Sequence, residues 1–371
     1  MLGPELQQVG RVHVRQDGRR LLYFGGCDYL RLSRDPRVLA AARTALRRYG
    51  LNVAASRVTT GNHPLYGELE RALAAFFQVE AGLVVPNGYA TNLVVAQALA
   101  GEVTHAFVDV AVHASPKDAA AALGCPVRTF AHHDARQLAS QLRRLPRRSR
   151  PVVFTDGLDA REGTVAPLAA YREALPATGW LVVDDAHGVG VMGAHGRGAP
   201  EACGVSSHYL IHTGTLSKAF GTYGGIVLGT RAVIDRVIKG SRQFAGSTPL
   251  PLPLAASALT SVRMVATEPG LRTRLVRNVV RFKEGLRALG LQPPATPAPV
   301  VSLQGADPTE NERLATRLRR RGIYPSLIRY AGGPAAGYFR FALSSAHTSA
   351  QIDRLLDALQ EVKGLQLVRH Q

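Results

Sequence analysis

Lys218 stands in a segment whose residue types suit an amine that reacts with an aldehyde. Residues 213–221 read Thr-Gly-Thr-Leu-Ser-Lys-Ala-Phe-Gly and directly follow an apolar run that ends near His212. An amine placed just past a strand can reach an aldehyde, while the hydroxyls of Thr215 and Ser217 face a phosphate. Taken alone, the segment is weak evidence, because most lysines are surface charges.

A second candidate segment lies upstream of Lys218. Residues 181–188 place Asp184, Asp185 and His187 at the end of another apolar run. An ionised Asp184 at the C-terminal end of a strand can pair with a protonated pyridine nitrogen, which makes the ring an electron sink. His187 can then hydrogen-bond the phenolic oxygen of the same ring. On its own, this run could equally be a set of metal ligands or a turn.

Two further segments suit a phosphate and an aromatic ring. Residues 87–92 follow an apolar run at 83–85 and open a helical pattern. Backbone amides at such a helix start form a phosphate cradle. Residues 109–115 contain His113, whose imidazole can stack on an aromatic cofactor ring. A histidine by itself is more often an ordinary core or surface residue.

The elements that position these residues alternate along the chain. Apolar residues at helical spacing predict helices at 35–50 and 65–77. Short apolar runs bounded by turn residues predict buried strands at 83–85, 151–154, 180–183, 209–212 and 225–228. Buried strands separated by helical stretches imply a mainly parallel sheet with right-handed crossovers. The predicted division is an N-terminal arm at 1–35, a large domain at 36–268 and a small domain at 269–371, which ends in a helix at 349–362.

Composition predicts a globular protein with a basic surface. The 371 residues are 46% hydrophobic and carry a formal net charge of +18, nearly all from arginine. Such a charge attracts phosphates or acidic proteins. Arginine clusters at solvated helix ends are the simpler explanation of the charge. Because the sequence shows no recognisable nucleic-acid-binding motif, a nucleic acid is a weak alternative partner. Without an apolar run long enough to span a membrane, or a signal peptide, we expect a cytoplasmic protein. Scattered Cys27, Cys125 and Cys203 are expected to be free thiols.

Together, the four segments resemble the α-oxoamine synthases, which are pyridoxal-phosphate (PLP) enzymes of fold type I. The resemblance covers nearly the whole chain, and it is also carried by residues 27–30, 56–57, 61–63, 68–70, 130–134, 163–168, 193–198, 247–248 and 340–347. It implies an aspartate aminotransferase-like α/β fold, with a mainly parallel central sheet and a smaller C-terminal α+β domain. PLP is the implied cofactor, and no metal is expected.

The resemblance also implies roles around the cofactor ring. Lys218 would hold PLP as a Schiff base, and Asp184 would pair with the pyridine nitrogen. His187 would contact the phenolic oxygen, and His113 would stack on the ring. These four residues are therefore the predicted catalytic set.

Other residues are implied to hold the phosphate and the substrate. The backbone at Gly88 and Tyr89 would bind the phosphate together with Thr215, and Thr248 would reach it from a second subunit. A homodimer with shared active sites is therefore the expected working unit. Arg340 would bind the carboxylate of the amino acid.

The reaction that the resemblance implies is the condensation of an amino acid with an acyl thioester. Lys218 or a neighbour would remove the α-proton, and the carbanion would attack acyl-CoA or an acyl-carrier-protein thioester. Loss of the thiol, and usually of CO2, leaves an α-aminoketone. The positive net charge suits both CoA phosphates and an acidic carrier protein.

Three positions depart from the family on the substrate side. The family usually has asparagine where Cys27 stands, serine at Ala160 and histidine at Tyr66, and the first two normally help Arg340 to hold the carboxylate. A glycine-rich turn is replaced at 51–55. Two interpretations follow. The substrate pocket could be repacked while the enzyme still catalyses the condensation, or the same fold could catalyse a different reaction.

Two functions of other classes remain open. A PLP aminotransferase of this fold would use a keto acid acceptor without any thioester. A non-catalytic binding module would have lost its chemistry and would present its basic surface to a partner. The joint retention of Lys218, Asp184, His187 and His113 counts against the binding module.

Overall fold

The chain folds into two compact units. The structure is a computed structural model that describes residues 3–329, 334, 336–362 and 364–369. The large unit comprises Asp35–Asp159 and Val165–Pro269, and the small unit comprises Met1–Arg34, Ala160–Thr164 and Gly270–Gln371. The arm predicted at 1–35 therefore shares a unit with the C-terminal residues, while the predicted domain limits stay a prediction. Among the described residues, no helix is both long and apolar enough to span a bilayer.

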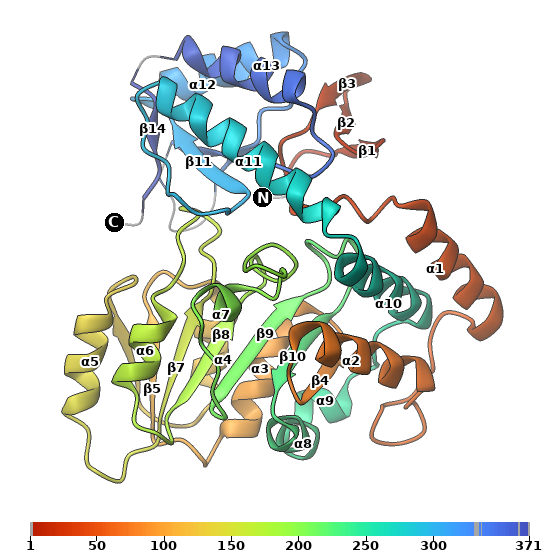
Figure 1. The fold of residues 1–371 in the computed structure, drawn as a ribbon, viewed down its shortest axis with the longest axis vertical. Helices are drawn as coiled ribbons and strands as arrows, with labels where there is room; N and C mark the ends of the chain where they lie inside the picture. The colour runs from red at the N-terminus through yellow and green to blue at the C-terminus, as the bar shows by residue number, and fades with distance from the viewer. Residues whose placement is uncertain (1–2, 330–333, 335, 363, 370–371) are drawn as a thin grey trace. The chain divides into compact units, whose positions relative to one another are not determined.

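A sheet of mostly parallel strands forms the centre of the large unit (Figure 1). Its strands lie in the order β4-β10-β9-β8-β7-β5-β6. The pairs β5/β6, β5/β7, β7/β8 and β8/β9 are parallel, whereas β10 is antiparallel to both β4 and β9. The predicted mainly parallel sheet is confirmed. The bounds are β4 Ala81–Val85, β5 His105–Asp109, β6 Val127–Phe130, β7 Pro151–Asp156, β8 Trp180–Asp184, β9 Leu210–Thr215 and β10 Gly225–Gly229.

Helices cover both faces of this sheet. Alternate strand residues point to opposite faces, so Ala106 and Val108 of β5 join one core and Phe107 joins the other. The first core includes residues of α3, α4, α8 and α9, and the second includes residues of α5, α6 and α7. Strands buried on both faces are apolar at nearly every position, which explains the short apolar runs in the sequence. These helices are α3 Gly88–Leu99, α4 Ala114–Ala121, α5 Ala135–Arg143, α6 Leu168–Ala174, α7 Ala199–Ala202, α8 Arg231–Gly240 and α9 Arg242–Gly246.

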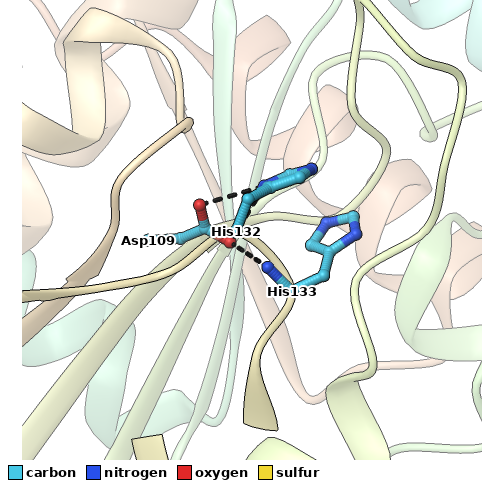
Figure 2. Close-up of side chains that lie close together, drawn as sticks. All are labelled: Asp109, His132 and His133. Carbon is cyan, nitrogen blue, oxygen red and sulfur yellow. Dashed lines mark hydrogen bonds and ion pairs between the residues drawn. The ribbon is translucent and has the colours of Figure 1, made fainter. Parts of the chain in front are cut away.

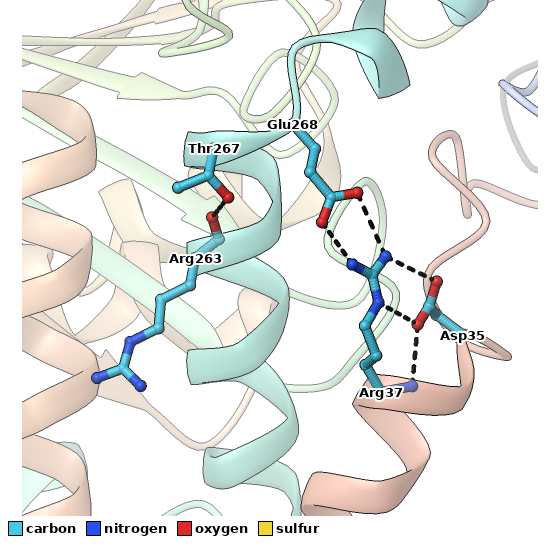
Figure 3. Close-up of polar contacts among 5 residues, drawn as sticks. All are labelled: Asp35, Arg37, Arg263, Thr267 and Glu268. Carbon is cyan, nitrogen blue, oxygen red and sulfur yellow. Dashed lines mark hydrogen bonds and ion pairs between the residues drawn. The ribbon is translucent and has the colours of Figure 1, made fainter.

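Helix α1 (Pro36–Tyr49) packs beside α10 (Leu252–Thr267) in the same unit. Asp35 caps α1 by accepting from the backbone N–H of Arg37 at 3.0 Å, and proline at the first turn suits a helix start. The Arg37 side chain then bridges Asp35 and Glu268, which lies at the end of α10 (Figure 3). Within α10, the Thr267 hydroxyl donates to the carbonyl oxygen of Arg263 at 2.9 Å. The ends of the two helices are therefore tied together by charge-assisted hydrogen bonds.

The small unit contains two antiparallel sheets within the described residues. One has the order β1-β2-β3 (Gln7–Val9, His13–Gln16, Arg19–Leu22), and the other has the order β12-β13-β11-β14. Helices α11 and α13 pack together, and so do α12 and α13. The remaining bounds are β11 Val300–Gln304, β12 Leu327–Ile328, β13 Tyr338–Ala342, β14 Gln366–Leu367, α11 Gly270–Ala288, α12 Pro308–Arg320 and α13 Ser349–Gln360.

The predicted helices agree with the structure, but one apolar face does not pack within the chain. The patterns at 35–50 and 65–77 correspond to α1 and to α2 (Pro64–Phe77). On α1, however, Leu39 and Leu46 are 46% and 45% exposed, whereas Val38 and Ala45 are buried. Residues seven apart share a helix face, so Leu39 and Leu46 form an exposed apolar stripe.

Candidate active site

The C-terminal ends of three neighbouring parallel strands bring polar residues to one edge of the large-unit sheet. β7 ends at Asp156, β8 at Asp184 and β9 at Thr215. In open α/β sheets, ligands bind beyond the carboxyl ends of the strands. Lys218 follows β9 directly, so its side chain starts at the same edge.

The Lys218 amine lies against His187. The distance between Lys218 Nζ and His187 Nε2 is 2.6 Å, and both side chains are partly exposed. His187 follows β8, whereas Lys218 follows β9, so the parallel pairing of the two strands brings them together. The two nitrogens lie within hydrogen-bonding distance, so a proton can pass between them.

Asp184 is held in one orientation from both sides. Its Oδ2 accepts from Asn92 Nδ2 at 2.6 Å, and its Oδ1 accepts from the backbone N–H of Ala186 at 3.1 Å. The residue is 8% exposed. Two N–H donors stabilise the ionised form of a buried carboxyl group, so a negative charge can be kept there opposite a cation.

His113 caps α4 and is neutral. Its Nδ1 accepts from the backbone N–H of Ser115 at 3.2 Å, and its own backbone N–H donates to Asp156 Oδ2 at 3.0 Å. Partial burial of the ring lowers the pKa of His113 below its ordinary value. Since Nδ1 acts as an acceptor, the ring proton is on Nε2, and the exposed ring face is free of charge for stacking.

Gly88 and Thr215 form a close backbone cradle. A Cβ atom at Gly88 would lie 2.9 Å from Thr215 Cβ and 3.0 Å from its Oγ1, so only glycine allows this approach. Thr215 Oγ1 also lies 2.8 Å from Ser217 Oγ. Gly88 and Tyr89 are the first residues of α3, whose positive dipole end therefore adjoins two hydroxyl groups. Such an arrangement suits a phosphate dianion.

Thr248 is not part of this cradle within the single chain. It is exposed on the loop that follows α9. Across the described residues, no hydrogen bond joins Thr248 to Gly88, Tyr89 or Thr215. Its predicted phosphate contact from a second subunit stays a prediction.

In the small unit, Arg340 contacts two of the three residues that depart from the family pattern, Ala160 and Cys27. Its Nε donates to the carbonyl oxygen of Ala160 at 3.0 Å, and its Nη1 and Nη2 lie 3.6 and 3.8 Å from Cys27 Sγ. Burial alone would lower the pKa of Arg340, but Cys27 and Tyr29 outweigh burial and raise it. The guanidinium therefore stays charged, with a thiol and a backbone carbonyl as neighbours. Cys27, Cys125 and Cys203, which all lie in the described part of the chain, form no disulfide, as expected.

Tyr66 is buried in the large unit. Its hydroxyl donates to the carbonyl oxygen of Leu250 at 2.6 Å, and the Arg57 guanidinium lies 4.9 Å from its ring centroid. Only 1% of Tyr66 is exposed. These contacts anchor α2 to the segment before α10, and the predicted substrate contact of Tyr66 stays a prediction.

A group that the sequence did not single out joins β5 to the segment after β6 (Figure 2). Asp109 Oδ1 lies 3.0 Å from His132 Nδ1, and Asp109 Oδ2 accepts from the backbone N–H of His133 at 3.0 Å. One ligand atom from each of these residues lies within 4.8 Å of the others, a spacing that a metal ion could use. Asp109 already accepts from Ala111 as well, and the two imidazole rings stack with their centroids 3.7 Å apart. The group therefore acts as a hydrogen-bonded link between strand ends.

The large-unit residues fit PLP. An amine, a fixed carboxylate and an imidazole lie around the ends of adjacent strands, and Gly88, at the start of α3, approaches Thr215 so closely that a Cβ atom would not fit. This donor set on this sheet defines the class of PLP-dependent enzymes of fold type I.

Comparisons of the sequence with known proteins agree with this class. A family model described as aminotransferase class I and II matches residues 20–359. The 8-amino-7-oxononanoate synthase of Thioalkalivibrio sulfidiphilus (strain HL-EbGR7) is 37% identical over 346 residues, which cover 92% of this chain and 88% of the relative. The synthase of the same name from Halorhodospira halophila (strain DSM 244 / SL1) is 39% identical over 357 residues, which cover 94% of this chain and 88% of the relative.

Solved structures extend the comparison. Serine palmitoyltransferase from S. paucimobilis with a bound PLP-myriocin aldimine has a TM-score of 0.89 at 28% identity, covering 95% of this chain and 90% of that one. The 8-amino-7-oxononanoate synthase of Francisella tularensis has a TM-score of 0.78 at 26% identity, covering 92% of this chain and 97% of that one. The chain therefore belongs to the α-oxoamine synthase family of PLP-dependent transferases.

Proposed function

We propose that this chain binds PLP and condenses an amino acid with an acyl thioester, releasing the thiol and, as is usual in the family, CO2, to give an α-aminoketone. The observation that carries the proposal is the large-unit group in which Lys218 Nζ lies 2.6 Å from His187 Nε2 beside the end of β8 that holds Asp184. The names of the relatives, 8-amino-7-oxononanoate synthase and serine palmitoyltransferase, support acyl transfer.

The residues of the large unit divide the chemistry among themselves. PLP, when bound, supplies an electron sink for the negative charge that develops at the α-carbon of the amino acid. Lys218 would hold the cofactor and then take the α-proton on Nζ, and the adjacent Nε2 of His187 would relay that proton. Asp184 would stay ionised opposite the pyridine nitrogen, and the neutral ring of His113 would stack on the cofactor without opposing its charge.

The phosphate site supports a homodimer. Gly88, Tyr89 and Thr215 would bind one side of the phosphate, and the exposed Thr248 would serve the partner subunit. The apolar stripe of Leu39 and Leu46 gives the chain a surface that a second copy would cover. Shared active sites would follow from that pairing.

The small unit would receive the amino acid. Arg340 would bind its carboxylate, but Cys27 and Ala160 replace the polar partners that the resemblance implies. We therefore expect a different amino acid from that of the relatives, held mainly by the guanidinium. The acyl donor would be a CoA or acidic carrier-protein thioester drawn by the positive net charge in the cytoplasm.

A spectral titration tests the proposal. Purified protein would be mixed with PLP, and the visible band of the lysine Schiff base would be recorded while single L-amino acids are added. We expect a band in the wild-type protein that one amino acid shifts. Sodium borohydride should then fix PLP to the residue at 218, and a protein that forms no such band would refute the proposal.

A PLP aminotransferase is the second candidate, and the contact between Arg340 and Cys27 favours it. A thiol is a weak hydrogen-bond acceptor and donor. The 3.6 Å contact with Cys27 therefore orients the Arg340 guanidinium toward a carboxylate less firmly than an amide would. An aminotransferase would convert PLP to its amine form with the amino acid alone and would return the amino group to a keto acid. Release of free thiol from acyl-CoA distinguishes the two functions.

A further inference from the structure

Two acidic side chains lie next to each other at the cofactor edge of the large-unit sheet. Asp156 ends β7 and Asp184 ends β8, and the two residues are direct partners in the parallel register. Asp184 and the Oδ1 atom of Asp156 are buried, and like charges on neighbouring strand ends disfavour simultaneous ionisation there. One of the two carboxyl groups is therefore expected to keep a proton.

The two carboxyl groups receive unequal numbers of hydrogen-bond donors. Asp184 accepts from the side chain of Asn92 at 2.6 Å and from the backbone of Ala186 at 3.1 Å, one donor on each oxygen. Asp156 accepts from the backbone N–H of His113 at 3.0 Å through Oδ2. Its Oδ1 is buried and has no hydrogen-bond partner among the described residues. The negative charge is thus better stabilised on Asp184.

Asn92 is the residue that creates this asymmetry. It is fully buried on α3, and its Nδ2 donates both to Asp184 Oδ2 and to Ser115 Oγ, the second at 3.0 Å. Its Oδ1 accepts from the Thr213 hydroxyl at 3.0 Å. A carboxylate oxygen 2.6 Å away requires an N–H donor, so the amide orientation is fixed.

The same amide ties together the elements that carry the site. Asn92 lies on the helix that Gly88 opens, and Ser115 lies on the helix that His113 caps. Thr213 lies on the strand that leads to Lys218. A change at Asn92 would therefore reach the phosphate cradle, the stacking ring and the carboxylate at once.

We propose that Asn92 is a positioning residue that makes Asp184 the charged member of this carboxyl pair and leaves Asp156 as the neutral acid. The inference rests on the proposed function only in assigning the ring nitrogen as the partner of Asp184. A neutral Asp156 still accepts from His113 and adds no second charge below the ring, so a protonated ring nitrogen would meet a single, fixed carboxylate.

The electrostatic surroundings agree with this assignment. Burial, followed by the charge of Asp184, raises the pKa of Asp156 well above its usual range. Asp159 raises this pKa further, whereas the backbone N–H of His113 and the charge of Lys218 act in the opposite direction.

Infrared spectroscopy of the PLP-free full chain tests the charge assignment directly. A protonated carboxyl group gives a C=O stretch that a carboxylate lacks. We expect this band near neutral pH in the wild-type protein, its loss in Asp156→Asn and its retention in Asp184→Asn. A band that survives in Asp156→Asn and disappears in Asp184→Asn would overturn the proposal, as would no band at all in the wild-type protein.

PLP affinity tests the role of Asn92. Asn92→Ala should weaken PLP binding about tenfold or more, because a buried charge-assisted hydrogen bond is lost. Asp156→Asn should change the affinity by less than about twofold, because an amide replaces a neutral acid of the same shape. Thr213→Val is the matched control, since it removes the hydroxyl that donates to Asn92 Oδ1 and leaves the bond from Asn92 to Asp184. Equal PLP affinities in Asn92→Ala and Thr213→Val would refute the role of Asn92.

The two tests separate this inference from the proposed function. If the wild-type protein binds no PLP, the proposed function fails, while the infrared result still decides which carboxyl group is protonated. Circular dichroism checks that Asn92→Ala is folded. If that variant does not fold, the infrared comparison of Asp156→Asn with Asp184→Asn decides the proposal alone.

Discussion

The predicted cofactor residues of the large unit (the cofactor half) and the predicted substrate residues of the small unit (the substrate half) hold their charged groups in different ways. In the large unit, Asp184 and Lys218 each contact a specific side chain at 2.6 Å. In the small unit, the Arg340 Nη atoms face a thiol at 3.6 and 3.8 Å, and Nε donates to a backbone carbonyl. Short charge-assisted hydrogen bonds fix geometry, whereas sulfur contacts do so weakly. The side chains of Asp184 and Lys218 are thus held in a fixed geometry, whereas the Arg340 guanidinium is held less firmly.

Removing Lys218 should abolish the function of the cofactor half. Lys218→Ala should lower the rate of product formation by about a thousandfold or more, because the variant lacks the amine that we propose holds PLP and takes the α-proton. The measurement is the turnover rate, together with PLP retention after borohydride treatment. Lys239→Ala, on the exposed surface of α8, is the control and should behave as the wild type. Retained turnover in Lys218→Ala would exclude this residue from the chemistry.

Neutralising Asp184 should damage the same half less severely. Asp184→Asn keeps the shape of the side chain but removes the charge opposite the ring nitrogen, so kcat should fall about a hundredfold or more. Asp184→Glu should recover part of the rate, because it restores the charge. Steady-state kinetics with a saturating amino acid would measure both variants, and an unchanged kcat in Asp184→Asn would contradict the role given to this carboxylate.

The contribution of the buried His347 to the stability of the small unit can be tested by lowering the pH. His347 Nδ1 accepts from the backbone N–H of Ser344, and its Nε2 contacts the carbonyl oxygen of Tyr23. Burial lowers the pKa of His347 to about 3. The unfolded chain binds this proton near the ordinary value of 6.5, so the stability contribution is complete above pH 6.5 and is lost as the pH falls toward 3. From pH 7 to pH 5, the wild-type free energy of unfolding should therefore fall by about 2 kcal/mol more than that of His347→Gln.

Urea unfolding of both proteins at each pH measures that difference. A wild-type loss no larger than the loss in His347→Gln would mean that His347 is already protonated in the folded state. The comparison uses the difference between two pH values, so a lower overall stability of the variant does not affect it.

Cys27 offers a way to sharpen the substrate half. Cys27→Asn replaces the thiol beside Arg340 with an amide, which should lower the KM for the amino acid about tenfold and leave kcat nearly unchanged, since one added hydrogen bond to a charged group stabilises the bound carboxylate. Cys27→Ser is the matched control, because it adds a polar atom without the reach of an amide. A higher KM in Cys27→Asn would show that the thiol itself recognises the substrate.

The sequence was informative about elements that depend on local pattern. The apolar runs at 151–154 and 180–183 lie within β7 and β8, and the run at 225–228 lies within β10. The antiparallel direction of β10 was not predicted. A strand that is buried on both faces has the same apolar pattern whether it is parallel or antiparallel to its neighbours. Only the connections and the pairing determine its direction in the sheet.

Contacts between residues far apart in the chain could not be predicted from the sequence pattern. Asn92 belongs to a segment that the sequence marked as a phosphate cradle, but its bond to Asp184 joins residues 92 positions apart. Similarly, the resemblance already connected the departures at Cys27 and Ala160 to Arg340, whereas the contacts that replace the lost partners, a thiol and a backbone carbonyl, required the fold. The exposure of Leu39 was also hidden, because a helix face that packs on a partner has the same spacing as one that packs in the core.

Thiol release is the measurement that tests the central claim most directly. The PLP-loaded protein would be supplied with a panel of acyl-CoAs and L-amino acids, and free CoA would be followed with a thiol reagent. Condensation predicts thiol release that requires both an amino acid and PLP and that is absent in Lys218→Ala. Transfer of the amino group to a keto acid, with no thiol released from any acyl-CoA or carrier-protein thioester, would contradict the account.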